Sequence, residues 1–212
     1  MTSDVVPGGR YADAVAYAAD VHARQVRKGT TIPYLAHLLG VSSLVLEAGG
    51  DEDLAIAALL HDAAEDHGGE ARLDDIAARF GERVAGIVRV CSDSLGAEGA
   101  PKADWETRKA EHLARLQGAD SDALMVWMAD KVHNGRAIVT DLTVFGPVAM
   151  ERFSAPADRV LWYYRENLAL ASARPVPPIL LAALESVVEQ MAVLLAADGE
   201  GTALPPGRPT GR

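Results

Sequence analysis

Apolar residues recur every three or four positions along most of this chain, a spacing that is typical of amphipathic helices. The pattern begins in residues 11–26, where Tyr11, Ala14, Val15 and Ala18 share one face of a predicted helix. Glycine and proline residues interrupt the pattern and separate the predicted helices. Further helices are predicted over residues 34–48, 51–66, 73–81, 82–92, 105–116, 122–142, 157–173 and 179–197. No segment shows the alternation of a strand, so the sequence predicts an all-α fold.

The most informative change in the pattern lies at the end of one predicted helix. Residues 54–60 are all apolar, and His61 and Asp62 follow them directly, with Glu65 and Asp66 one turn later. A segment this apolar is expected to be buried, so its polar end is expected to face a cavity. Because residues three and four apart share a helix face, Glu65 and Asp66 should reach the same cavity.

Charged residues also interrupt the apolar pattern of the predicted helix 122–142. Asp130 and Asn134 lie four positions apart and therefore share one face, among leucine, valine, methionine and tryptophan residues. A carboxylate in such surroundings is costly to bury unless it binds a cation or pairs with a base. Earlier in the chain, a predicted loop carries Arg27 and Lys28, and its ordinary interpretation is a solvated basic turn.

Composition narrows the class of protein. The chain has 212 residues, 49% of them hydrophobic, which suits one domain with a sizeable core. We expect residues 1–9 to form a flexible leader, residues 10–197 a single domain, and residues 198–212 a disordered tail rich in glycine and proline. The formal net charge of −10 disfavours nucleic acid as a partner, because such binding needs a basic surface.

Location can also be predicted from the sequence. No apolar run reaches the roughly 18 residues that a membrane span needs, so we expect no membrane association. The N-terminus has no basic region followed by an apolar core, which indicates that no signal peptide is present. Cys91 is the only cysteine, which excludes an internal disulfide framework. We therefore expect a cytoplasmic protein, and an oligomer is compatible with this sequence.

Four polar residues on three predicted helices suggest a metal site: His37, His61, Asp62 and Asp130. Neutral imidazole and carboxylate together suit Mn²⁺, Fe²⁺, Zn²⁺ or Co²⁺, whereas a closed structural zinc site more often uses cysteine. Two histidines and two aspartates leave coordination positions open for water and substrate, as in hydrolytic sites. Taken singly, His37 is more commonly a helix cap or a core residue, and Asp130 the partner of a nearby base such as Lys131.

Longer motifs carry a resemblance to a known family. They read RQVRKG at residues 24–29, PYLAH at 33–37, AALLHDAAED at 57–66, FGERV at 80–84 and MADKVHNGR at 128–136. The order His, His-Asp, Asp resembles the HD-domain metal-dependent phosphohydrolases. Together the motifs resemble the hydrolase half of the Rel/Spo alarmone enzymes and the stand-alone small alarmone hydrolases. The similarity runs from about residue 11 to residue 141 and implies an HD-domain helical bundle.

The resemblance also implies a reaction. One Mn²⁺ would be held by the four polar residues His37, His61, Asp62 and Asp130. Glu65 and Asp66 would position and activate the attacking water. The reaction would be hydrolysis of the 3′-pyrophosphate of an alarmone nucleotide, (p)ppGpp or (p)ppApp, with release of pyrophosphate. This chemistry is coherent, because a metal lowers the pKa of its bound water and a nearby carboxylate can take the proton.

Substrate contacts follow from the same resemblance. Arg27 and Lys28 match the basic pair that the family places beside the nucleotide base. Asn134 matches a polar contact near the ribose and the metal. Lys102 would contact phosphate from the segment after Ser94, together with Arg108 and Lys109.

The sequence departs from the family pattern at two positions near the expected ligands. Leu38 stands where the family usually has proline after the first histidine, which changes the local backbone but not the ligand. His67 stands where the family usually has threonine, and we expect His67 to be exposed. The chain shows no second lobe with nucleotidyl-transfer motifs, so alarmone synthesis is not expected.

Three alternatives stay open at this point. The base of the nucleotide can be guanine or adenine. The enzyme can instead be a broader phosphatase of the HD superfamily that acts on NADPH or on 5′-nucleotides. A degenerate HD fold can also bind a nucleotide and regulate a partner without turnover. The intact set of ligands and acidic residues argues against this last alternative, because a lapsed enzyme has no chemical reason to keep all six.

Overall fold

The structure is a computed structural model in which residues 7–92 and 104–196 are described. Within these ranges every regular element is a helix, which confirms the predicted all-α class. Across the same ranges the only extended pairing is an isolated bridge between Val26 and Pro33. The expected tail, the first six residues of the expected leader and Lys102 lie outside the described residues.

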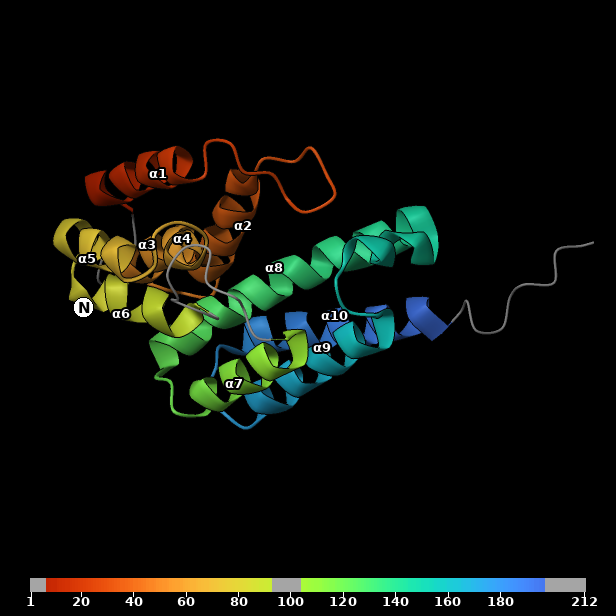
Figure 1. Ribbon diagram of the computed structural model, residues 1–212. Coiled ribbons are helices and arrows are strands. Elements are labelled where there is room, and N and C mark those ends of the chain that lie inside the picture. The colour runs from red at the N-terminus through yellow and green to blue at the C-terminus, as the bar shows by residue number, and fades with distance from the viewer. Residues whose placement is uncertain (1–6, 93–103, 197–212) are drawn as a thin grey trace, which may run out of the picture.

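The described helices follow one another with short connections. In chain order they are α1 (Gly9–Val21), α2 (Tyr34–Glu47), α3 (Glu52–Leu60), α4 (Ala63–Asp66), α5 (Gly69–Phe80), α6 (Glu82–Cys91), α7 (Trp105–Gln117), α8 (Ser121–Phe145), the 3₁₀ helix η1 (Gly146–Arg152), α9 (Ala157–Ser172) and α10 (Pro178–Ala196). In Figure 1, α1 to α6 gather at one end of the molecule, and α8 runs from this group along α9 and α10. Helix α8 packs against α2, α3 and α6 on one side and against α9 and α10 on the other, so it connects both groups.

Aspartate side chains begin three of these helices: Asp51 for α3, Asp104 for α7 and Asp120 for α8. Each carboxylate accepts a hydrogen bond from the backbone N–H three residues later, at 2.8–3.0 Å. Such caps satisfy N–H groups that have no partner within the helix. The cap at Asp51 fixes where α3 enters the core.

The apolar run 54–60 forms the centre of the α1 to α6 group. Its residues are at most 5% exposed, and α3 packs against α1, α2 and α6. The predicted single helix 51–66 is wrong in one respect, because α3 ends at Leu60 and α4 begins only at Ala63. His61 and Asp62 lie in this break, so the buried run delivers them into the interior.

The first helix is shorter than predicted and ends at Val21, not at residue 26. The following residues instead pair their backbone with the start of α2. The Arg27 N–H donates to the Ile32 carbonyl and the Tyr34 N–H donates to the Gln25 carbonyl, both at 2.9 Å. Gly29, at φ +73°, makes the turn between them, a conformation that glycine adopts without strain. We call residues 22–33 the 22–33 loop.

Helix α10 is the one described helix that is long and apolar enough to cross a membrane by length and composition. The expectation that no such segment exists was wrong by this measure, because an average over 18 residues tolerates Glu185 and Glu189. One face of α10 is nevertheless buried, including Leu184, Val187 and Met191, and the helix packs against α8 and α9. Core helices pass the same test, so α10 is compatible with a place in the core.

Candidate active site

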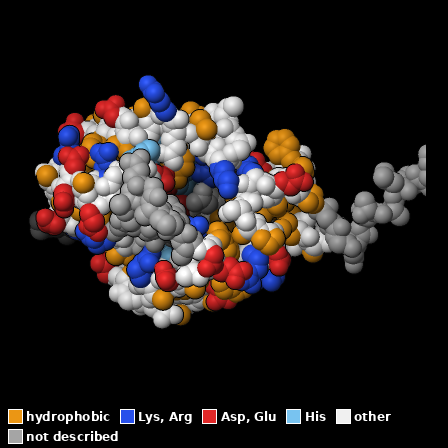
Figure 2. Space-filling model, viewed as in Figure 1, with side chains coloured by type: hydrophobic (Ala, Val, Ile, Leu, Met, Phe, Trp, Pro, Cys, Tyr) orange, Lys and Arg blue, Asp and Glu red, His pale blue; other side chains and the backbone are white. Residues whose placement is uncertain are grey.

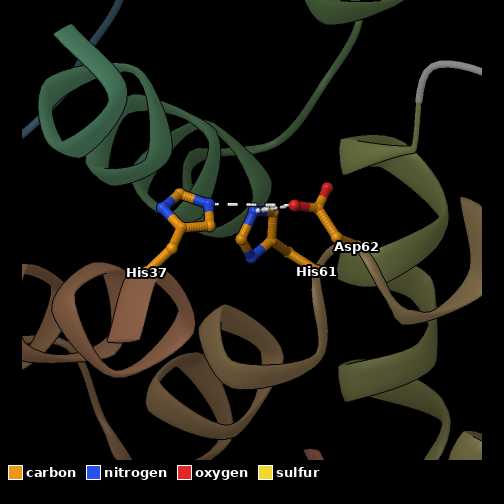
Figure 3. Close-up of side chains that lie close together, drawn as sticks. All are labelled: His37, His61 and Asp62. Carbon is orange, nitrogen blue, oxygen red and sulfur yellow. Dashed lines mark ion pairs between the residues drawn. The ribbon is translucent and has the colours of Figure 1, made fainter. Parts of the chain in front are cut away.

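His61 and Asp62 face one point because the helix breaks between α3 and α4. Their backbones have φ, ψ values of −57°, −30° and −98°, −6°. His61 Nε2 lies 3.0 Å from Asp62 Oδ2. Figure 3 shows both side chains turned toward the same space, with the His37 ring opposite them. Because of this break, the side chains of two consecutive residues point into the same site.

His37 of α2 and Asp130 of α8 complete the cluster that the sequence predicts. His37 Nε2 lies 3.2 Å from Asp130 Oδ1 and 3.7 Å from Asp62 Oδ2, and His61 Nε2 lies 3.6 Å from Asp130 Oδ1. Ligand atoms of His37, His61 and Asp62 all lie within 4.8 Å of one another, close enough to hold one metal ion. Four residues that are up to 93 positions apart in sequence therefore meet at one point.

The two histidines present unsatisfied nitrogen atoms to the carboxylates. Nε2 of His37 and Nε2 of His61 are buried without a hydrogen-bond partner among the described residues. The other ring nitrogens are occupied: His61 Nδ1 donates to the Ala58 carbonyl at 2.8 Å, and His37 Nδ1 lies 2.9 Å from His133 Nδ1. A buried ring nitrogen that faces carboxylate oxygens needs a positive charge at that point, which a proton on the ring or a bound metal ion supplies. The chemistry of these donors therefore fits a divalent metal ion.

The electrostatics of the cluster point the same way. Burial lowers the pKa of His61, but the charge of Asp62 outweighs burial and raises that pKa well above its ordinary value. Burial raises the pKa of Asp62 and of Asp130, yet His61 and Lys131, respectively, outweigh it and hold both pKa values well below the ordinary range. Both carboxylates are therefore ionised in the interior, where they attract positive charge.

Two residues that were not predicted from the sequence support the cluster. The Tyr34 hydroxyl donates to Asp62 Oδ2 at 2.5 Å, and His133 contacts His37. Burial, the nearby charge of His37 and that of Arg27 lower the pKa of His133 to about 4, so its ring is neutral at physiological pH. Tyr34 precedes His37 by three positions, one helical turn, and this spacing was a signal that sequence reasoning could have used.

The acidic pair follows the cluster on α4. Glu65 is half-buried and Asp66 is exposed. The Gln25 side chain donates to Asp66 Oδ2 at 2.7 Å, and its oxygen accepts from His22 Nδ1 at 2.6 Å and from His67 Nε2 at 2.9 Å. The expectation that His67 is exposed was therefore wrong. Its ring is half-buried because Gln25 binds it and His22 contacts it edge-on.

A cavity of about 450 Å³ lies beside the cluster. Its walls come from the 22–33 loop, α8, η1 and α9, and Arg27, Lys28 and Asn134 are among the residues that line it. Arg27 Nη2 donates to Asn134 Oδ1 at 2.8 Å, and Asn134 Nδ2 donates to Asp130 Oδ1 at 2.5 Å. This chain of hydrogen bonds connects the cavity wall to the cluster. The volume is in the range of small-molecule sites.

Further cations line the cavity. Lys131 Nζ pairs with Asp130 Oδ2 at 2.8 Å. Lys109 Nζ lies 5.1 Å from the centre of the Tyr163 ring, and Lys131 Nζ lies 5.8 Å from it. Figure 2 shows a hollow on one face of the molecule with lysine and arginine side chains at its edge. A cavity with this charge suits an anionic ligand.

Comparison with known proteins places these observations in a wider group. The HD domain family matches residues 14–144, more than half of the chain. A Drosophila melanogaster protein named guanosine-3′,5′-bis(diphosphate) 3′-pyrophosphohydrolase MESH1 is 32% identical over 133 residues, which are 61% of this chain and 70% of that protein. A Synechocystis protein, a probable enzyme of the same name, is 30% identical over 125 residues. Those residues are 59% of this chain and only 16% of the Synechocystis protein.

The fold is shared with solved structures as well. The structure of a metazoan orthologue of SpoT, a protein described as hydrolysing ppGpp, matches with a TM-score of 0.69 at 27% identity. The match covers 87% of this chain and 97% of that one. A match of this extent must include residues outside 14–144, the range of the family match.

Proposed function

Because this chain belongs to the HD domain family, we propose that it is a metal-dependent 3′-pyrophosphohydrolase of the alarmone ppGpp. The observation that carries the proposal is the convergence of His37, His61, Asp62 and Asp130 beside a cavity lined with cations. The Drosophila relative, of which the chain spans 70%, is named for this reaction. We also propose that residues 10–197 form one domain and that the enzyme acts in the cytoplasm.

The four clustered residues would hold the metal, and the unpartnered Nε2 atoms of His37 and His61 support this assignment. We propose Mn²⁺, since two imidazoles and two carboxylates form a ligand set that this ion accepts. When bound, the ion acts as a Lewis acid and lowers the pKa of a water molecule. Asn134 would keep Asp130 oriented through the 2.5 Å hydrogen bond to its Oδ1.

Glu65 and Asp66 would position the attacking water and take its proton. The water oxygen forms a bond to the phosphorus that is attached to the ribose 3′ oxygen, and the bond between that phosphorus and the 3′ oxygen breaks. The 3′ oxygen takes up a proton, so the products of ppGpp are GDP and pyrophosphate. Gln25 would hold the Asp66 carboxylate in place during this step.

The cavity would hold the rest of the nucleotide. Arg27 and Lys28 would lie beside the base and Asn134 near the ribose, and the hydrogen bond from Arg27 to Asn134 keeps these two groups together. Lys109 lines the cavity and would contact phosphate, as would Lys102 from its segment outside the described residues. Positive groups in this number are expected to offset much of the negative charge of two bound diphosphate groups.

Product analysis tests the proposal. The Mn²⁺-loaded protein is given ppGpp, ppApp, NADPH and GMP in parallel, and products are separated by anion-exchange chromatography. Pyrophosphate together with GDP from ppGpp is the expected result. Inorganic phosphate from NADPH or GMP, with both alarmones intact, would assign the enzyme to the broader phosphatases instead. Absence of turnover with all four substrates would favour a non-catalytic nucleotide-binding protein.

A double variant, Glu65→Gln with Asp66→Asn, isolates the role of the acidic pair. It keeps the size and polarity of both side chains but removes their ability to take a proton. We expect retained Mn²⁺ and at least a hundredfold loss of kcat. A rate within a few-fold of the wild type would remove the pair from the chemical step.

A further inference from the structure

The far end of the cavity holds a second charged feature, an ion pair between Asp141 of α8 and Arg152 of η1. Asp130, Asn134 and Asp141 are spaced by four and seven residues, so they follow one face of α8. At 1.5 Å per residue, Asp141 lies about 16 Å along the helix from Asp130. The ion pair is thus on the same wall as the metal cluster, but at the opposite end of it.

Arg152 is held in place from several sides. Its guanidinium group donates to Asp141 Oδ2 and lies 4.9 Å from the centre of the Phe153 ring. The 22–33 loop covers its aliphatic part, since a Cβ built on Gly29 would lie 3.1 Å from Arg152 Cβ. Oδ1 of Asp141 has no hydrogen-bond partner among residues 7–92 and 104–196. Both side chains are about one-fifth exposed, at 22% and 20%. The pair is therefore fixed but accessible from the cavity.

The charges along the cavity favour one orientation of a bound nucleotide. Lys131 and Lys109 lie near the cluster end and around Tyr163, where phosphate groups are attracted. The charge of Asp141 is balanced by Arg152, so the pair adds no net positive charge at its end of the cavity and suits an uncharged group that both donates and accepts hydrogen bonds. Apolar side chains line the space nearby, among them Ile138 and Phe153, and they suit the flat face of a base.

We propose that Asp141 and Arg152 select guanine over adenine, an inference that rests on the function proposed above. The edge of guanine carries two donors, N1–H and the N2 amino group, beside the O6 acceptor. Asp141 accepts from the donors, and Arg152 donates to O6. Adenine presents the reverse order, with an N6 amino donor toward Arg152 and an N1 acceptor toward Asp141. The same two side chains therefore attract one purine and repel the other.

The variant Asp141→Asn tests this proposal, because an amide keeps the shape of the carboxylate but loses its purely accepting character. The readout is the ratio of kcat/KM for ppGpp to kcat/KM for ppApp. We expect a ratio of about 10 to 100 in the wild type and a fall of at least fivefold in the variant. A general loss of stability changes both substrates alike and leaves the ratio unchanged. The matched control is Glu151→Gln, at an exposed carboxylate outside the cavity lining, which should keep the wild-type ratio.

A binding measurement separates this inference from the proposed reaction. Calorimetric titration of the protein with GDP and with ADP reports base preference without any turnover. If neither alarmone is hydrolysed but GDP binds more tightly than ADP and Asp141→Asn removes the difference, the proposed reaction fails and the base selection stands. If the alarmones are hydrolysed with equal kcat/KM, or if Asp141→Asn leaves the ratio unchanged, the base selection is overturned and the proposed reaction stands. Equal binding of GDP and ADP by an inactive protein overturns both.

Discussion

Nε2 of His61 lies 3.0 Å from Oδ2 of Asp62, although the two residues are adjacent in sequence. Consecutive residues of a continuous α-helix point about 100° apart, because the helix has 3.6 residues per turn. Their approach therefore depends on the break between α3, which ends at Leu60, and α4, which begins at Ala63. The buried apolar run holds this break inside the protein, and the predictions that follow concern the groups arranged around it.

Removal of one ligand should empty the metal site. In Asp130→Ala, His37 Nε2 and His61 Nε2 lose the carboxylate oxygen that lies 3.2 Å and 3.6 Å from them. We expect bound Mn²⁺ after dialysis, measured by atomic emission, and ppGpp turnover each to fall at least about 100-fold. Asp13→Ala, at an exposed residue of α1, is the matched control and should keep both. Normal turnover in a metal-free Asp130→Ala protein would contradict the metal mechanism.

Gln25 should set the position of the acidic pair without holding the metal. Gln25→Leu removes the hydrogen bond to Asp66 and leaves the rings of His22 and His67 without their shared acceptor. We expect kcat to fall about tenfold at unchanged metal content, because a carboxylate that is free to turn is correctly placed less often. Gln117→Leu, at an exposed residue, is the control for replacing a glutamine by a leucine, and it should leave kcat unchanged. An unchanged kcat in Gln25→Leu would assign the bond a structural role only.

His22 should make the fold less stable in acid. Burial lowers the pKa of His22, although Gln25 stabilises its charged form and His67 and Asp66 act on it with opposite signs. The folded state therefore binds its proton less readily than the unfolded state. Stability from this group is complete above pH 6.5 and is lost as the pH falls below that value. The loss for one proton is about 1 kcal/mol per pH unit.

Urea unfolding at pH 7.5 and pH 5.5 measures this effect. The free energy of unfolding should fall more in the wild type than in His22→Gln, which carries no titrating ring at this position. The comparison between the two proteins removes the contributions of the other histidines. An equal fall in both proteins would show that His22 titrates normally in the fold.

Two glycines in helices should respond to alanine in opposite directions. A Cβ at Gly135 of α8 would lie 2.3 Å from Val187 Cγ1 of α10 and 2.9 Å from the Tyr164 ring of α9, so Gly135→Ala forces these helices apart. A Cβ at Gly86 of α6 would meet nothing within 4 Å. We expect Gly135→Ala to lower the free energy of unfolding by about 1–3 kcal/mol. Gly86→Ala should raise it by about 0.5–1 kcal/mol, because alanine favours a helix. Thermal and urea unfolding of the two variants measure this difference, and a stable Gly135→Ala protein would contradict the close packing.

Helix positions could be predicted from the sequence because burial of one face imposes the 3.6-residue period. The ligand set could be predicted as well, since polar residues such as His61 and Asp130 in apolar surroundings need a compensating partner. The structure brings these residues together. Their roles as ligands, and those of Glu65 and Asp66 in the reaction, stay predictions until the experiments above are done.

Other features depend on contacts that fall outside the three- and four-residue spacing of a helix. The residues after α1 form backbone bonds between Arg27 and Ile32 and between Tyr34 and Gln25, which span five and nine residues. His67 has an ordinary polar position in the sequence, and it is half-buried because Gln25 and His22, 42 and 45 residues earlier, contact it. The pairing of Asp141 with Arg152 likewise depends on how η1 folds back on α8. Helix propensity and hydrophobic periodicity depend only on residues that are close in sequence, so they do not predict such contacts.

Within the 22–33 loop, Gln25 and Arg27 are two positions apart, and each reaches a different part of the site. Gln25 binds Asp66 of the acidic pair, and Arg27 binds Asn134 on the cavity wall. Because only two residues of backbone connect them, a shift of Arg27 is expected to shift Gln25 and with it Asp66. A minimal phosphate ester has no base to contact Arg27, so it cannot change the position of Gln25 in this way. We expect such a fragment to react slowly even when it saturates the site, so the enzyme would be protected against wasteful cleavage of the many small phosphates around it.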